Sequence, residues 1–292
     1  MKRPYLLALA LTAAPTLAQD RPPPITGTEI LVVGERGKQE QQAEQIKDFV
    51  RALSSERWDI PMTRFEAICP GVIGLPPARN LEIARRIRAV ATAAGITVGE
   101  EACRPNLRVV VIPDKEEMLD LLKRKHPALF RDYDRKPVNL VKEDGPVIAW
   151  HVRQKLDRQG NTLEPGPNGI TTISIDGASP RVLAVYRPVA MGAMILMEQK
   201  GLVGLTTTQI ADYAAMRALT TIHPQRLSRS NAPTILHVMT SKIGDDTPPS
   251  LTQWDFAFLK TAYSVPPYSY SSSQRARIRR AIEQEVASAG SQ

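Results

Sequence analysis

Residues 191–219 constrain the fold of this chain more than any other stretch. An apolar run typical of a strand, MGAMILME, leads through a glycine-containing turn into TTTQIADYAAMRAL. Thr206 and Gln209 have the T-x-x-Q spacing of a capping box, in which each side chain bonds a backbone N–H at the start of a helix. The helix would carry a stripe of small residues at helical spacing, namely Ala211, Ala214, Ala215 and Ala218. Such a stripe lets another element approach closely, so we expect a central, buried helix.

The first 18 residues have the pattern of a cleaved secretory signal. Lys2 and Arg3 precede an apolar run over 6–14, and small residues follow. We expect the mature chain to begin near Gln19 with a proline-rich leader over 19–28. No later run reaches the roughly 18 apolar residues that a membrane span needs. The mature protein is therefore predicted to be periplasmic or secreted, without a transmembrane span.

The charge of the chain is modestly basic. Removal of the signal takes away two of the 38 basic residues and none of the 30 acidic ones, so the formal net charge falls from +8 to +6. The remaining charge is spread along the chain, and this distribution does not favour a nucleic-acid partner. The partners we expect are an anionic component of the cell envelope or another envelope protein. Arginines on two predicted helices could contact such a component: Arg79, Arg85, Arg86, Arg88, Arg275, Arg277, Arg279 and Arg280.

The two cysteines of the chain, Cys69 and Cys103, predict a disulfide, because an exported protein folds in an oxidising compartment. The bridge would close a loop of about 35 residues and contribute roughly 3 to 4 kcal/mol in the chain-entropy model. The two cysteines do not have the CxxC spacing, and no histidine is close to either in the sequence. We therefore expect neither a metal site nor a redox centre there.

The remaining hydrophobic patterns mix strands and helices without strict alternation. Strands are predicted at 29–35, 107–112, 146–152, 170–175, 181–186 and 234–239, with a β-like segment over 60–68. Helices are predicted over 38–54, from Pro76-Pro77 to Gly95, after Asp114, over 251–263, and from Ser272 or Ser273 through about 289. This order predicts an α+β or irregular α/β fold with a mixed sheet and packed helices. We expect one domain over 29–292, with 157–169 as the best internal boundary if there are two.

The histidines and known catalytic patterns do not define an active site. His126, His151, His223 and His237 are all far apart in the sequence, and the chain has no HExxH, nucleophile elbow, P-loop or dinucleotide-binding pattern. We therefore predict no metal and no cofactor. Asp212 could be combined with His223 or His237 and one of many serines into a triad, but the sequence favours no one choice.

Three segments together resemble an uncharacterised group of secreted bacterial proteins: CRPNLRVVVI, QIADYAAMRAL and LTQWDFAFLKTAY. The likeness covers most of the mature chain and implies no activity. The order of a helix, a short β piece and an LT..D..FL...Y helix is also similar to the zincin superfamily of zinc peptidases. Over residues 211–219, Ala211 and Ala215 stand where that family's HExxHxxGL motif has its ligand histidines, and Asp212 stands in place of the glutamate. The resemblance thus implies a degenerate fold that has lost its zinc, because a methyl group cannot coordinate a metal.

Asp212, Tyr213 and Arg217 are the candidate binding residues, since they are polar groups on a helix of small residues. Each also has a structural interpretation: Arg217 can lie over Tyr213 as a cation–π pair, and Asp212 near a helix start favours the macrodipole. Two functional hypotheses follow. The favoured one is a non-catalytic envelope binding protein, and the alternative is a hydrolase with an unrecognised site or a degenerate metallopeptidase.

Overall fold

The computed structural model describes residues 27–54, 60–132, 138, 140, 145–166, 173, 183–222, 227, 230–242 and 244–289, with side chains from residue 40 to 288. The predicted signal peptide and nearly all of the leader lie outside these residues. The chain divides into two compact units, residues 1–41 and residues 42–292. In the first, the described residues belong to helix α1 (Gly27–Ala52), so the strand predicted at 29–35 is wrong. The β-forming residues there do not enforce a strand, because β propensity depends on the packing that a sheet provides.

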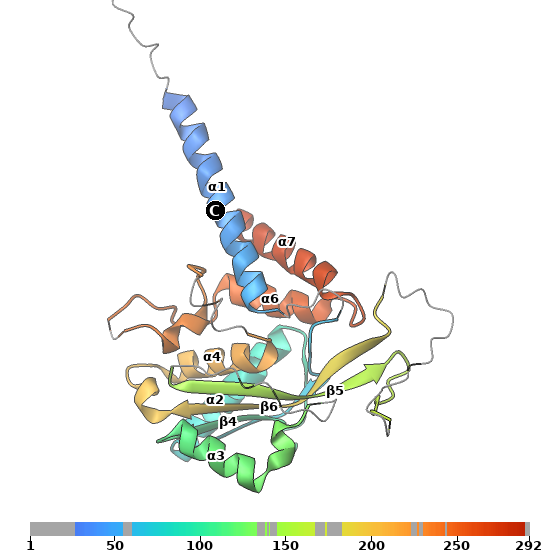
Figure 1. Ribbon diagram of the computed structural model, residues 1–292. Coiled ribbons are helices and arrows are strands. Elements are labelled where there is room, and N and C mark those ends of the chain that lie inside the picture. Colours follow the sequence, from blue (N-terminus) through green and yellow to red (C-terminus); the bar gives the residue numbers. More distant parts are fainter. Residues whose placement is uncertain are drawn as a thin grey trace, which may run out of the picture. The chain divides into compact units, whose positions relative to one another are not determined.

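The second unit is an α+β fold built on a four-stranded mixed sheet (Figure 1). The strand order is β2 (Pro70–Ile73), β4 (Leu107–Ile112), β6 (Tyr186–Glu198) and β5 (Val147–Asp157). Strands β2, β4 and β6 run parallel, and β5 is antiparallel to β6, with an irregularity after Val152. The predicted strands at 107–112 and 146–152 are confirmed, and the apolar run at 191–198 is the second half of β6. Two short strands, β1 (Ala67–Ile68) and β3 (Thr97–Val98), pair separately.

Alternating side chains give the sheet two apolar faces. Leu107, Val109 and Val111 point to the main core, which is covered by α2 (Pro77–Ala93) and α4 (Thr207–Leu219). The neighbouring Ile112 points to a smaller core beneath α3 (Lys115–Lys125) and the 3-10 helix η1 (Pro127–Phe130). Helices α3 and α4 accordingly lie on opposite sides of the sheet (Figure 1).

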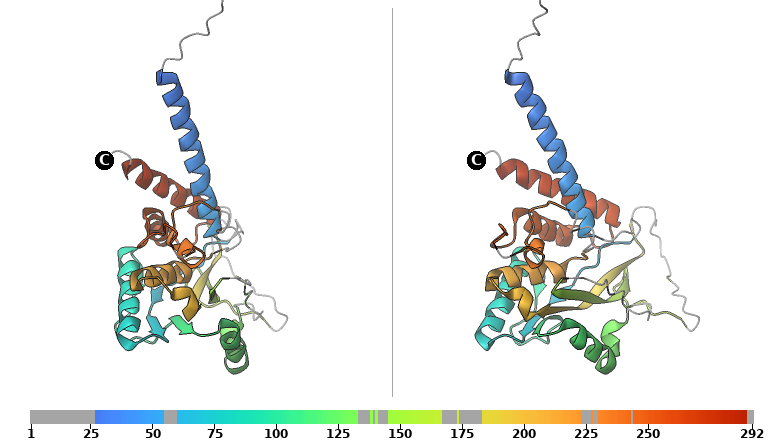
Figure 2. Two further views of the ribbon diagram at one scale, coloured as in Figure 1. Left: turned by 90° about the vertical axis from the view of Figure 1, so that its left-hand side faces the viewer. Right: turned by 60° about the vertical axis from the view of Figure 1, so that its left-hand side comes forward.

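A further helical layer packs against α4 within the second unit. Helices α6 (Gln253–Ser264) and α7 (Ser271–Ala289) lie side by side in both views (Figure 2). Phe49, near the end of α1, packs its ring against those of Trp254 and Phe258 at centroid distances of 5.7 and 6.0 Å. These side chains are buried, so α4 lies between the sheet and a second apolar layer.

The ends of several helices form as the capping patterns predict. Thr206 and Gln209 make both bonds of the capping box at the start of α4. Asp114 accepts the N–H groups of Glu116 and Glu117 at the start of α3, and α2 begins at Pro77. These outcomes follow from local chemistry, because a cap needs only residues adjacent to the helix end.

Two other element predictions are wrong. Residues 235–239 form the 3-10 helix η3 (Ile235–Met239), because Thr234 and Asp255 accept the N–H groups of Leu236 and Ile235. Helix α7 begins at Ser271, so Ser272 and Ser273 lie inside its first turn rather than capping it. The strand predicted at 170–175 lies outside the described residues except for residue 173. Of the strand predicted at 181–186, residues 183–186 are described, and only Tyr186 belongs to a strand, as the first residue of β6. Within the part of the chain that is described, no helix is both long and apolar enough to cross a membrane.

Two glycines with left-handed backbones provide a test of the packing at the edge of the sheet. Gly74 has φ +99° and Gly160 has φ +89°. A Cβ on Gly74 would lie 2.0 Å from the carbonyl oxygen of Val111, whereas a Cβ on Gly160 would have no neighbour within 4 Å. We predict that Gly160→Ala costs about 1 to 2 kcal/mol from backbone strain alone. Gly74→Ala should cost about 4 kcal/mol or more, since strain and overlap both contribute. Equal losses in denaturant melts of the two variants would contradict this packing.

Candidate functional site

Asp212 is the most deeply buried of the three candidate residues, with a side chain that is 0% exposed. Arg86 of α2 donates to both of its carboxylate oxygens, from Nε at 2.7 Å and from a terminal nitrogen at 3.0 Å. Ser250 Oγ and the Leu251 N–H donate to Oδ2 at 2.8 and 2.9 Å. A buried carboxylate is stable only when it is paired and hydrogen-bonded, and these four bonds supply both conditions.

This arrangement corrects the macrodipole interpretation of Asp212. A helix start alone does not require burial, yet every residue of α4 from Gln209 to Leu219 is buried. The small-residue stripe faces its neighbours as predicted, with Ala211, Ala214 and Ala215 at 0% exposure. Asp212 is buried as well because α2 and the segment before α6 cover its side of the helix. The carboxylate therefore joins three segments that are distant in the sequence.

The other end of α4 is tied by two partly buried side chains. The Nε2 atom of His151, on β5, lies 2.7 Å from the carbonyl oxygen of Ala218 and must carry the proton, since a carbonyl only accepts. The hydroxyl of Tyr263, on α6, donates to the carbonyl oxygen of Leu219 at 3.3 Å. Burial lowers the pKa of His151 to about 4 and raises the pKa of the Tyr263 hydroxyl above its ordinary value. Both side chains are therefore neutral at physiological pH.

Tyr213 and Arg217 are also buried, at 4% and 6% exposure. The positive charge of Arg217 contributes to the lowered pKa of His151, as does that of Arg153, while the charge of Asp132 opposes them. The helix therefore brings Arg217 near His151. Arg86, Ser250 and Leu251 donate the hydrogen bonds that the Asp212 carboxylate accepts, and none of these three residues is on α4.

A second buried carboxylate, Asp255, was not identified from the sequence. Thr234 Oγ1 donates to its Oδ1 at 2.5 Å, and the N–H groups of Ile235 and Thr252 donate to its Oδ2 at 2.9 and 3.0 Å. Burial raises the pKa of the Asp255 carboxyl, although these hydrogen bonds act to lower it. The T-x-x-D spacing of Thr252 and Asp255 indicates a capping box. The bonds that Asp255 accepts from Thr234 and Ile235 cannot be read from the sequence, because no pattern connects residues about 20 positions apart.

The described residues contain no group of three or more His, Cys, Asp or Glu side chains placed to hold a metal ion. Ala211 and Ala215, which the zincin alignment places at ligand positions, are buried methyl groups. His237 is half-buried, and burial lowers its pKa. His223 lies outside the described residues.

Comparison with known proteins gives no assignment. No family model matches the chain, and neither a curated protein nor a solved structure matches it.

Asp212→Asn tests whether the carboxylate has the structural role that its contacts indicate. The amide keeps the size but loses the charge, and its NH₂ group faces a donor where the carboxylate accepted a bond. We predict a loss of about 2 to 4 kcal/mol in the free energy of unfolding, measured by denaturant melts. Asp120→Asn is the matched control on exposed α3, where Asp120 pairs with Lys123 at 3.7 Å, and it should change stability by less than about 0.5 kcal/mol. Equal losses of stability in the two variants would contradict the burial of the Asp212 carboxylate.

His151 should make the protein sensitive to acid. The unfolded chain takes up the histidine proton near pH 6.5, whereas the folded protein takes it up only near pH 4. Between these values the unfolded state binds more protons, so stability falls as the pH drops from 6.5 to 4, by about 3 kcal/mol. His151→Gln keeps a donor for Ala218 but cannot titrate, and melts should show this part of the pH dependence removed. A variant with the slope of the wild type would show that other groups cause it.

Proposed function

We propose that the chain is an exported, non-catalytic binding protein of the cell envelope. The observation that carries the proposal is the use of its candidate polar residue as a structural tie: Asp212 accepts four bonds from Arg86, Ser250 and Leu251. Its acceptor sites are filled by the protein, which argues against a role as a general base or nucleophile. The Cys69–Cys103 disulfide fits a protein that folds in an oxidising compartment.

The ligand we propose is an anionic component of the envelope, bound on the outer face of α7. The arginines of α2 divide into two groups, because Arg86 and Arg88 are partly buried and bond to other parts of the protein, whereas Arg79 and Arg85 are exposed. Arg277 and Arg280 of α7 are both exposed. They are three residues apart and so lie on one face of the helix, whereas residues 79 and 85, six apart, do not. Two cations on one face can contact one anionic group together.

The test is binding of the purified mature protein to phosphatidylglycerol vesicles, with phosphatidylcholine vesicles as the uncharged reference. A parallel arm uses lipopolysaccharide, which separates a lipid headgroup from a polysaccharide source. We predict that Arg277→Glu/Arg280→Glu weakens binding to the preferred anion at least about tenfold at low salt. Arg79→Glu/Arg85→Glu makes the same change in net charge on α2 and should reduce binding much less. Loss of binding in both variants alike, or no binding by the wild type, would contradict the proposal.

A further inference from the structure

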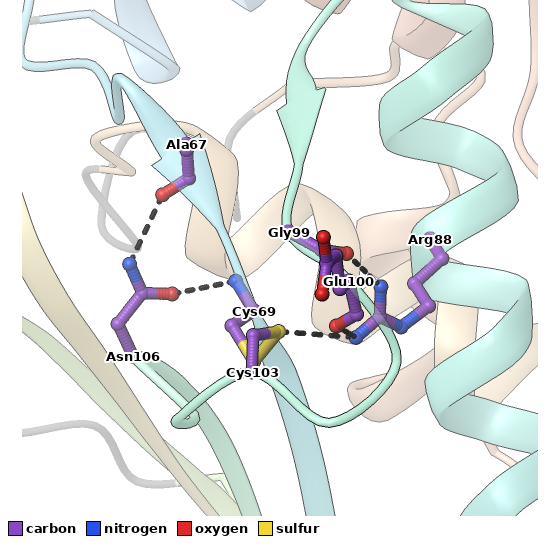
Figure 3. Close-up of a disulfide and its surroundings, with 7 residues drawn as sticks. All are labelled: Ala67, Cys69, Arg88, Gly99, Glu100, Cys103 and Asn106. Atoms are coloured by element: carbon purple, nitrogen blue, oxygen red, sulfur yellow. Dashed lines mark hydrogen bonds between the residues drawn. A yellow bond between two sulfur atoms is a disulfide. The ribbon is translucent and has the colours of Figure 1, made fainter.

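The Cys69–Cys103 disulfide has a cation at one of its sulfurs. The structure confirms the predicted pairing, with a sequence separation of 34. Figure 3 shows Arg88 reaching from α2 to the loop that carries Cys103. One terminal nitrogen of Arg88 lies 3.2 Å from Cys103 Sγ, and the guanidinium also donates to the carbonyl oxygens of Gly99 and Glu100, at 2.5 and 3.0 Å. A guanidinium at this distance stabilises a thiolate more than the neutral sulfur of a disulfide.

Hydrogen bonds hold the two cysteine segments together independently of the sulfur–sulfur bond. Asn106 accepts the Cys69 N–H at 2.7 Å through Oδ1 and donates to the Ala67 carbonyl oxygen at 3.0 Å through Nδ2 (Figure 3). The N–H groups of Asn106 and Leu107 both donate to the Cys69 carbonyl oxygen, at 3.0 and 3.1 Å. The Gly99 N–H donates to the Ile68 carbonyl oxygen at 2.8 Å. Opening the disulfide therefore leaves both segments in place, with the sulfurs positioned to close again.

We propose that this disulfide is a reversible thiol–disulfide exchange site for small thiols of the glutathione class, and that Arg88 sets its equilibrium. Cys69 is buried at 5% exposure and Cys103 is half-buried, so the external thiolate approaches Cys103. It bonds to Cys103 Sγ, the protein disulfide breaks, and the electron pair leaves on Cys69, which takes a proton. A second external thiol then attacks the outer sulfur of the mixed disulfide. The electron pair of the broken sulfur–sulfur bond now leaves on Cys103, beside Arg88. In total, one protein disulfide and two small thiols are converted into two protein thiols and one small disulfide.

The contacts give the equilibrium a direction. Arg88 favours the Cys103 thiolate, which is a species of the reduced protein, and it therefore makes the disulfide easier to reduce. The sequence does not indicate this, because the cysteines lack the CxxC spacing and the cation comes from a helix between them. The inference concerns the face of α2 toward the disulfide and is independent of ligand binding on α7.

The experiment equilibrates the mature protein with glutathione buffers of graded composition and counts free thiols after an acid quench. We expect Arg88→Gln to need a ratio of reduced to oxidised glutathione about tenfold higher for half reduction, since a charged hydrogen bond is lost. Arg88→Lys, which keeps the charge, should fall between the variant and the wild type. Arg85→Gln is the matched control on the exposed side of α2 and should behave as the wild type. Equal midpoints for wild type and Arg88→Gln would overturn the role of Arg88.

A second measurement on the wild type covers the case in which Arg88→Gln does not fold. The fully reduced protein should keep its native near-UV circular dichroism signal. The rate of Cys103 alkylation should fall to half its maximum at a pH well below about 8.5, which is the ordinary pKa of a cysteine thiol. Loss of the native signal on reduction, or a midpoint at or above 8.5, would show that the disulfide is a fixed structural bridge.

Discussion

The ion pair between Arg86 and Asp212 is the contact on which the packing around α4 depends. An isolated carboxylate cannot be buried, so α4 can lie between the sheet and the α6–α7 layer only if a cation accompanies it. Arg86 supplies the cation from α2, and Ser250 with Leu251 completes the set of donors from the segment before α6. The same four bonds thus fix the positions of two helices and one connection. The burial of Asp212 is thus a consequence of where α4 lies.

Helix α2 supplies both the arginine that pairs with Asp212 and the arginine that contacts Cys103. Arg86 and Arg88 are two positions apart and so point to different sides of the helix. One meets Asp212, and the other meets the loop of Cys103. The face of the helix that lies between these two sides is apolar, and its residues Ile83, Ile87 and Val90 are buried in the main core. One helix therefore connects the packing of α4 with the surroundings of the disulfide.

Much of the fold could be predicted from the sequence where the determining residues are neighbours. The capping box of Thr206 and Gln209, the helix start at Pro77 and the strand at 107–112 are of this kind, and the disulfide required only that two cysteines be paired. The site was less predictable because its partners are remote: Arg86 lies 126 residues from Asp212. The same reason explains the wrong strand at 234–239, where Asp255 accepts the N–H of Ile235 from 20 residues away.

The position of β6 in the sheet has a consequence for the order in which the chain can fold. Strand β6 pairs with β4 on one side and with β5 on the other, although it follows both in the sequence. A chain that is synthesised from its amino end can form the β2–α2–β4 unit early, since the contacts of this unit are local. The inner edge of β4 then stays open until residues 186–198 arrive, and β5 has no strand to join before that. An apolar strand with an open edge is prone to pair with another chain. The interval between synthesis of β4 and arrival of β6 is thus when a nascent molecule is most exposed to aggregation, and when a holding chaperone would contribute most.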